Sequence, residues 1–192
     1  MGEHFFAYLA RMKYINRWGL MRNTVEENIQ EHSHMVAVLS HALAVIAREK
    51  FGSTLDPGQA AIAGLYHDAS EILTGDLPTP VKYDNPAIKD AYKAVERLAA
   101  DKLLTMLPDE LRPAFAPYVR EELDEELLRV VKAADKLSAY LKCVEECKAG
   151  NSEFTLAARQ TRAALEAMEL PALDYFLTHF LPSFELTLDE LS

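Results

Sequence analysis

The sequence predicts an all-α protein, a helical bundle folded as a single domain over residues 1–192. Apolar residues recur every three or four positions along most of the chain, which is the period of amphipathic helices. Glycines and prolines interrupt this pattern where helices would end. No pair of segments with alternating polarity indicates a β-hairpin, and no repeat or low-complexity stretch divides the chain. A length of 192 residues is typical of one domain with a substantial core.

The expected helices follow from apolar stripes bounded by capping residues and breakers. They cover residues 5–16, 31–50, 56–74, 85–106, 121–149, 152–168 and 173–181. The inward residues of the first two helices are Phe5, Leu9, Met12, Ile15, Val36, Leu39, Leu43 and Ile46. The third helix is bounded by Asp56 as a cap, Pro57 at the first position and Gly75 at the stop.

Prolines and an acidic run divide the C-terminal half of the chain. The inward residues of the helix over 85–106 are Ile88, Tyr92, Val95, Leu98 and Leu103 or Leu104. Pro108, Pro113 and Pro117 restrict the following stretch to short helical turns. The acidic run over residues 121–126 opens the next long helix, where carboxylates complement the helix dipole. Pro171 separates the last two helices.

Composition and charge exclude several classes of protein. A hydrophobic content of 49% argues against disorder. The formal net charge of -10 argues against a nucleic-acid polymer as partner, because such a surface needs a basic stripe. It still permits a small anionic ligand, since a metal ion and one or two arginines can reverse the local field. No apolar run is long enough to span a membrane and the N-terminus lacks a signal-peptide pattern, so a cytoplasmic protein without a membrane partner is expected.

The two cysteines, Cys143 and Cys147, lie four positions apart on a predicted helix. This spacing suits an unstrained disulfide poorly, so both are expected as reduced thiols. A thiolate metal pair is the alternative, but no second cysteine pair is present to complete a structural zinc site.

The third predicted helix is apolar except near its end, where His67, Asp68 and Glu71 follow one another closely. On a helix Glu71 lies one turn beyond both other residues, so the three side chains point roughly the same way. The preceding residues on this face are Ala60, Ala63, Gly64 and Leu65, which predicts that the face is buried. A buried acid beside a buried imidazole must be hydrogen-bonded, ion-paired or bound to metal. A chance dipeptide is the more common explanation of an isolated His-Asp pair, so partners elsewhere must decide.

Two further residues place polar groups on apolar stripes. His32 begins the inward stripe of the second helix, where a lone histidine is more often a core residue than a ligand. His34 and His41 fall on other faces or farther along, and neither is expected in a site. Asp135 interrupts the apolar stripe of a long helix, and its apolar flanks predict burial. Because a buried, unpaired aspartate is costly, Asp135 needs a partner.

Two other stretches are candidates for ligand contacts. Arg17 offers a planar fork suited to phosphate, and Trp18 offers a flat wall for a sugar or base. The loop after the third helix is stiff and polar, with Asp76, Leu77, Pro78, Thr79 and Pro80. The alternative interpretations are a packing anchor beside a solvated charge and an ordinary connection between helices.

Three predicted helix faces thus carry His32, the pair His67 and Asp68, and Asp135. Two imidazoles and two carboxylates suit one divalent transition ion with open positions for water and substrate. Manganese, cobalt and iron fit this set of ligands, and zinc is an alternative. Too few soft ligands are present to favour copper(I).

The order His32, His67-Asp68 and Asp135 resembles the H…HD…D pattern of the HD-domain metal-dependent phosphohydrolases, whose fold is a helical bundle. Over nearly the whole chain the sequence is more similar still to the bacterial 5'-deoxynucleotidases of that superfamily. The HD doublet alone is moderately specific, whereas the matching blocks in this order are highly specific. These blocks are Ile15-Asn16-Arg17-Trp18, Leu20-Met21-Arg22-Asn23, Glu31-His32-Ser33, residues 66–71, residues 73–82, Tyr140-Leu141-Lys142-Cys143 and Pro182-Ser183-Phe184.

The resemblance implies roles for individual residues. One divalent ion is implied to bind to His32, His67, Asp68 and Asp135. The ions implied are Co²⁺ or Mn²⁺ first, with Fe²⁺, Zn²⁺ or Cu²⁺ as alternatives. Glu71 is implied to position or activate the attacking water, and Arg17 to orient the phosphate. The substrate-binding residues implied beside Arg17 are Trp18, His32, Asp76, Leu77, Pro78 and Thr79. Asp76 either protonates the leaving 5'-oxygen or only binds the substrate.

The activity implied by the resemblance is metal-dependent hydrolysis of 2'-deoxyribonucleoside 5'-monophosphates to deoxynucleosides and phosphate. Selectivity against ribonucleotides follows if Trp18 packs where a 2'-hydroxyl would sit. Relatives also imply a homodimer. The alternatives are an HD-domain hydrolase of a nucleoside triphosphate or a pyrophosphorylated guanosine, and a non-catalytic metal-binding helical module.

Overall fold

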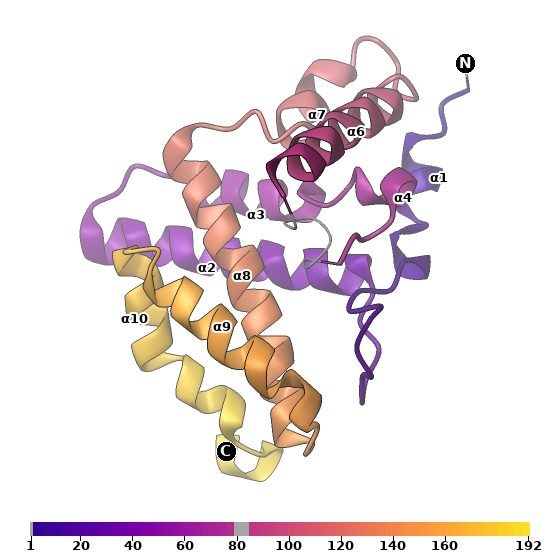
Figure 1. The fold of residues 1–192 in the computed structure, drawn as a ribbon. Coiled ribbons are helices and arrows are strands. Elements are labelled where there is room, and N and C mark those ends of the chain that lie inside the picture. The colour runs from indigo at the N-terminus through magenta and orange to yellow at the C-terminus, as the bar shows by residue number, and fades with distance from the viewer. Residues whose placement is uncertain (1, 79–84) are drawn as a thin grey trace.

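The computed structural model describes residues 2–78 and 85–192, which form helices joined by turns and by longer loops such as residues 15–28 (Figure 1). The α-helices are α1 (Phe5–Leu9), α2 (Ile29–Phe51), α3 (Pro57–Tyr66), α4 (Glu71–Thr74), α6 (Pro86–Leu104), α7 (Arg112–Val119), α8 (Glu125–Lys148), α9 (Thr155–Glu166) and α10 (Pro171–His179). The 3-10 helices are η1 (Met12–Tyr14), η2 (Ser152–Phe154), η3 (Leu181–Glu185) and η4 (Leu188–Leu191). Extended pairing within the described ranges is one isolated bridge between Asn16 and Asn28, so the all-α prediction is confirmed. None of the described helices is both long and apolar enough to cross a membrane.

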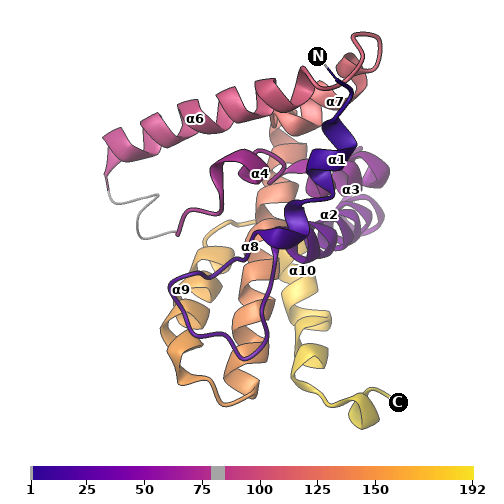
Figure 2. The ribbon, with the colours of Figure 1, turned by 90° about the vertical axis from the view of Figure 1, so that its right-hand side faces the viewer.

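The two longest helices, α2 and α8, cross near the centre of the molecule, and the shorter helices pack around them (Figure 1). The helices α3 and α10 lie against α2, and α9 lies against α8. Figure 2 shows α6 and α7 at the end of the molecule opposite α9 and α10. The larger group of buried apolar side chains lies between α2, α3, α8 and α10, and a smaller one lies between α1, α6 and α7.

The start of α2 is fixed by a capping box that sets the position of His32. The Asn28 side chain accepts hydrogen bonds from the backbone N–H groups of Gln30 and Glu31, both at 3.1 Å. The Glu31 carboxylate in turn accepts from the Asn28 N–H at 3.2 Å. His32 therefore lies in the first turn of α2, where its side chain is fully buried, as its place on the apolar stripe predicts.

The prediction of one continuous helix over residues 56–74 is wrong, although Asp56 does cap α3. The helix α3 ends at Tyr66, and α4 begins at Glu71. Between them the N–H of Glu71 donates to the carbonyl of Asp68 at 3.0 Å, three residues back rather than four. These tighter turns place the His-Asp pair at the end of α3 rather than inside a longer helix.

The face of α6 that packs inward matches the predicted one only at Tyr92, Leu103 and Leu104. Ile88, Val95 and Leu98 are 37%, 48% and 69% exposed. Tyr92 does turn inward, since its hydroxyl donates to the Gly75 carbonyl at 3.1 Å. The buried residues of α6 are Ala99, Ala100, Leu103 and Leu104. Alanine permits close approach to the neighbouring helices α4 and α7, a preference that the spacing of large apolar residues does not reveal.

Other sequence predictions hold with local changes. The helix expected over residues 5–16 is divided into α1 and η1. Leu65 is 42% exposed and does not belong to the buried face predicted for it. Cys143 is buried, Cys147 is partly buried, and both are free thiols, as predicted. Burial raises the pKa of the Cys143 thiol to about 12.

The helices α2 and α3 approach each other closely because Gly64 has no side chain. A Cβ atom at Gly64 would lie 2.7 Å from the Cα and 2.8 Å from the backbone nitrogen of Ala37 in α2. Backbone atoms inside a packed core cannot move aside as the end of a flexible side chain can. This contact therefore sets the distance between the two helices that carry His32 and the His-Asp pair.

The substitution Gly64→Ala is expected to lower the free energy of unfolding by about 1–3 kcal/mol, as overpacking does. In a helix without such a contact, alanine is more stabilising than glycine by about 0.5–1 kcal/mol. A lower free energy of unfolding in the Gly64→Ala protein would therefore indicate the clash with the α2 backbone. Gly58→Ala in the same helix is the control, because a Cβ there contacts only the Asp56 side chain, at 3.2 Å. Urea denaturation measures both variants, and a Gly64→Ala protein as stable as the parent would contradict this account.

Candidate metal centre and substrate pocket

Two histidines and two aspartates converge between α2, α3 and α8. His32 of α2, His67 at the end of α3 and Asp135 of α8 offer ligand atoms that all lie within 4.8 Å of one another. Asp68 Oδ2 is 3.1 Å from His67 Nε2 and 3.6 Å from His32 Nε2. Asp135 Oδ1 is 3.0 Å from His32 Nε2. The structure thus brings together the four residues predicted as metal ligands, whereas the other two histidines of α2 are exposed.

A hydrogen bond on the Nδ1 atom orients each imidazole. His67 Nδ1 lies 2.8 Å from the carbonyl oxygen of Gly64, which can only accept, so Nδ1 carries the proton. His32 Nδ1 lies 3.1 Å from the Ser138 hydroxyl. In both rings Nε2 is then the atom that faces the carboxylates. This orientation is typical of histidines that bind a metal ion through Nε2.

Electrostatics favour a positive charge between these side chains. Burial lowers the pKa of His67, but the carboxylates of Asp68 and Asp135 outweigh it and raise that pKa to about 9. Burial also opposes ionisation of Asp68, yet His67, His32 and Arg17 hold the pKa of its carboxyl far below the usual range. Despite desolvation, the hydrogen bond and charge of His32 hold the pKa of Asp135 low as well. A field that favours a proton here also favours a divalent cation, so the residues present fit a metal ion.

Asp135 is less buried than its apolar flanks predict. Its side chain is 45% exposed, against 18% for Asp68 and 6% for His67. The prediction fails because this part of α8 forms one wall of a cavity of about 650 Å³, into which the carboxylate is exposed. The cluster can therefore be reached by a small ligand in the cavity.

The cavity also brings the predicted catalytic and substrate-binding residues next to the cluster. Glu71, at the start of α4, lines the cavity and is 5% exposed. The other predicted residues along its walls are Arg17, Trp18, Asp76, Leu77 and Pro78. Thr79 lies outside the described residues.

Three polar residues that line the cavity were not predicted to belong to the site. Lys136 comes from α8, and Gln160 and Thr161 come from α9. In the sequence all three occupy ordinary polar positions of amphipathic helices, so nothing distinguishes them from solvent-facing residues. Only the packing of α9 on α8 reveals them.

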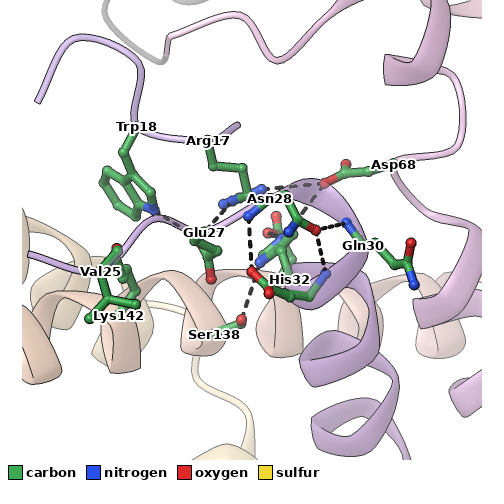
Figure 3. A network of polar contacts seen from close by, with 12 residues as sticks. Arg17, Trp18, Val25, Glu27, Asn28, Gln30, His32, Asp68, Ser138 and Lys142 are labelled. Carbon is green, nitrogen blue, oxygen red and sulfur yellow. Dashed lines mark hydrogen bonds and ion pairs between the residues drawn. The ribbon is translucent and has the colours of Figure 1, made fainter. Parts of the chain in front are cut away.

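The Glu27 carboxylate accepts hydrogen bonds from two residues that line the cavity, Arg17 and Trp18 (Figure 3). Its Oε2 atom accepts hydrogen bonds from Arg17 Nε at 3.1 Å and from Trp18 Nε1 at 2.9 Å. Arg17 Nη1 also lies 3.4 Å from Asp68 Oδ2. Burial lowers the pKa of Arg17, but nearby carboxylates, those of Asp68 and Asp135 first, raise it above its ordinary value. The Arg17 guanidinium therefore stays charged. Glu27, which holds it, was not predicted from the sequence, because the segment that contains it has no helical periodicity.

A buried ion pair anchors residues 19–28, the segment that leads into α2, to α8. Lys142 and Glu146 are 6% and 2% exposed, and the ammonium and carboxylate groups contact each other. The Glu146 carboxylate accepts from the backbone N–H of Thr24 at 2.8 Å and of Val25 at 3.2 Å. The Lys142 ammonium donates to the Val25 carbonyl. Burial opposes ionisation of Glu146, but hydrogen bonds from Lys142, Asn151 and Thr24 hold the pKa of its carboxyl well below the ordinary value.

The arrangement of helices is similar to that of HD-domain phosphohydrolases. The HD-domain phosphohydrolase from Listeria innocua superimposes with a TM-score of 0.83 at 23% identity, over 96% of this chain and 90% of that one. The Cyanophage S-2L HD phosphohydrolase DatZ, solved with dA and one catalytic Zn²⁺, gives a TM-score of 0.68 at 21% identity, over 94% and 96% of the two chains. At these identities the likeness concerns the fold, and it confirms the predicted HD-domain helical bundle.

The sequence narrows this class to one family. A family model described as 5'-deoxynucleotidase YfbR-like matches residues 4–184, and the chain belongs to this family. The 5'-deoxynucleotidase VP0926 of Vibrio parahaemolyticus is 54% identical over 191 residues, which are 99% of this chain and 98% of that protein. The 5'-deoxynucleotidase YfbR of Salmonella newport is 55% identical over 191 residues, 99% of this chain and 96% of that protein.

The substitution Glu146→Gln is expected to lower the free energy of unfolding at pH 7 by about 3–5 kcal/mol, because it leaves the Lys142 ammonium buried without its carboxylate. The pKa of the Glu146 carboxyl is lower in the folded protein than its ordinary value of 4.5. The carboxylate therefore contributes its full stabilisation at pH values above 4.5, and this contribution is lost as the pH falls toward the folded-state pKa. The difference from the parent should therefore narrow between pH 7 and pH 3.

Urea denaturation at the two pH values measures this difference. Glu145→Gln is the matched control, because burial raises the pKa of the Glu145 carboxyl and its ionised form does not stabilise the fold. An equal loss of stability at both pH values in the Glu146→Gln protein would contradict the role given to the charge.

Proposed function

We propose that this protein is a metal-dependent 5'-deoxynucleotidase that hydrolyses 2'-deoxyribonucleoside 5'-monophosphates to deoxynucleosides and phosphate. The observation that carries the proposal is a cluster of two imidazoles and two carboxylates whose carboxylates, Asp68 and Asp135, line one cavity of about 650 Å³ together with the charged Arg17. Membership of the 5'-deoxynucleotidase YfbR-like family supports the same activity. Relatives at 54% and 55% identity over nearly the whole chain carry that enzyme's name.

The residues proposed to hold one divalent metal ion are His32, His67, Asp68 and Asp135. Two nitrogen and two oxygen ligands suit Co²⁺ or Mn²⁺ first, with Fe²⁺, Zn²⁺ or Cu²⁺ as alternatives. Zinc gains support from DatZ, whose structure contains one catalytic Zn²⁺. When bound, such an ion lowers the pKa of a water molecule and neutralises charge on the phosphoryl oxygens.

Glu71 is proposed to accept a proton from the attacking water. Its carboxylate lies at the start of α4 and lines the cavity together with Asp68 and Asp135. A positioned carboxylate at this place can act as the general base of hydrolysis. Asp76 lines the same cavity, where it either protonates the leaving 5'-oxygen or only binds the substrate.

Arg17 and Trp18 are proposed to bind the phosphate and the deoxyribose. The Arg17 guanidinium stays charged among its carboxylate neighbours and can form paired hydrogen bonds with phosphoryl oxygens. The Trp18 ring lines the cavity beside it, where it would exclude a 2'-hydroxyl or leave it unpaired. Leu77 and Pro78 line the same cavity and are proposed to complete the sugar site, and the contact predicted for Thr79 stays a prediction.

The assembly and the compartment also stay predictions. A homodimer and a cytoplasmic location are proposed from the resemblance and from the composition of the chain. The alternative activities differ in their products, since a hydrolase of triphosphates or of a pyrophosphorylated guanosine releases triphosphate or pyrophosphate. A non-catalytic helical module would bind a metal and release nothing.

Phosphate release from dAMP and AMP tests the proposed function. Metal-stripped protein should be inactive, and Mn²⁺ or Co²⁺ should restore release from dAMP at a rate roughly 10- to 100-fold above that from AMP, the effect of a buried hydroxyl left unpaired. Glu71→Gln should lower the rate by about 10²- to 10⁴-fold while the protein still binds the ion, because only the general base is removed. The control is Glu49→Gln, an exposed position of α2.

Three outcomes would count against the proposal. Unchanged activity of Glu71→Gln would remove the general base from the account. Equal rates on dAMP and AMP would remove the sugar selectivity. Release of triphosphate or pyrophosphate from other nucleotides, with none from dAMP, would favour a different HD-domain hydrolase.

A further inference from the structure

Glu27 ties together a cationic and an aromatic residue of the cavity wall, Arg17 and Trp18. One carboxylate oxygen, Oε2, accepts from both Arg17 Nε and Trp18 Nε1, at 3.1 and 2.9 Å (Figure 3). The side chains of Arg17 and Glu27 are 13% and 15% exposed, so this ion pair is largely screened from water. Hydrogen bonds to an ionised carboxylate are the stronger kind, and here one acceptor fixes two side chains.

Trp18 needs such a restraint because its backbone is in an unfavourable conformation. Its φ angle is 59°, in the left-handed region that a bulky residue rarely adopts. Such a conformation persists when several surrounding contacts together hold the residue in it. The indole ring packs against Phe154 with ring centres 5.3 Å apart, and its N–H is held by Glu27.

The backbone of Glu27 acts on the same pair of residues. Its carbonyl accepts from the Arg17 N–H at 2.8 Å, next to the bridge between Asn16 and Asn28. Glu27 therefore contacts the Arg17–Trp18 pair through both its main chain and its side chain. A shift of either residue requires Glu27 to move as well.

Glu27 is itself held on both sides along the chain. On one side, Thr24 and Val25 are bound by the buried Lys142–Glu146 pair of α8. On the other side, Asn28 caps α2. The carboxylate is thus fixed before any ligand enters, which is the arrangement that a precise binding site requires.

We propose that Glu27 is a positioning residue that sets the orientation of the Arg17 guanidinium and the Trp18 indole together, and so couples phosphate binding to exclusion of the 2'-hydroxyl. The inference rests on the proposed function for its substrate, but the geometry that it assigns to Trp18 does not depend on turnover. With Nε bonded to Glu27, the planar guanidinium has one orientation, and its Nη1 atom lies toward Asp68 and the cavity. Loss of Glu27 releases the phosphate contact and the sugar wall in one step.

Trp18 fluorescence gives a readout that needs no activity, because Trp18 is the chain's only tryptophan. In metal-free Glu27→Ala and Glu27→Gln proteins, loss of the carboxylate should shift the emission maximum to longer wavelength and raise quenching by acrylamide. The amide of the Glu27→Gln protein keeps an uncharged acceptor, so the change should be smaller than in the alanine variant. Glu26→Gln, at the exposed neighbouring position, should leave the emission unchanged.

Kinetics of the metal-loaded proteins supply the second readout. Glu27→Ala should reduce the preference for dAMP over AMP by about tenfold, with a raised KM for dAMP, as expected when a hydrogen bond to a charged group is lost. Unchanged emission and an unchanged dAMP preference in both Glu27 variants would overturn the proposal. So would an equal loss on both nucleotides with a lower Tm and unaltered emission below Tm, since that pattern indicates a structural role only.

The two readouts separate this inference from the proposed function. If the parent protein releases phosphate from neither nucleotide, the proposed function fails, and the emission of the Glu27 variants alone decides the positioning of Trp18. Altered emission in both variants with normal emission in Glu26→Gln then supports the proposal, and normal emission throughout overturns it.

Discussion

The structure depends on two partly buried carboxylates that need positive charge beside them. Asp68 and Asp135 both lie within about hydrogen-bonding distance of imidazole nitrogens in a partly buried space, where unpaired carboxylates are costly. Arg17 supplies part of the required positive charge, and His67, whose pKa is raised to about 9, supplies more as a proton. A divalent ion meets the same demand at the same place. The electrostatics of the cluster therefore favour a bound cation, independently of any reaction.

The helices hold this cluster through a few contacts that serve packing and chemistry together. Gly64 lets α3 lie against the backbone of α2, and its carbonyl orients the His67 ring. The capping box at Asn28 places His32 in the first turn of α2. The buried Glu146 holds residues 19–28 against α8, the helix that also carries the partly exposed Asp135 of the cluster. Stability of the fold and geometry of the site thus depend on the same residues.

The sequence predicted that the residues of this cluster would meet because His32 and Asp135 place polar groups on apolar stripes, and a buried polar group needs a partner. It predicted most helices for a similar reason, since their boundaries carry caps and breakers. It could not show the turn over residues 67–70, where no glycine or proline interrupts the helical pattern and tertiary packing decides. It also missed Glu27, whose donors lie ten and nine positions away across a segment without periodicity. Contacts of that kind have no local signature.

We propose that one cation bound in this cluster makes the cavity a catalytic site. The most direct test adds Mn²⁺ in steps to metal-stripped protein and follows, in the same samples, the bound ion by equilibrium dialysis and phosphate release from dAMP. Both signals should rise together and saturate at one ion per chain, since the two imidazoles and two carboxylates form a single set of ligands. Phosphate release before any ion is bound, or saturation of binding with no release, would contradict the claim.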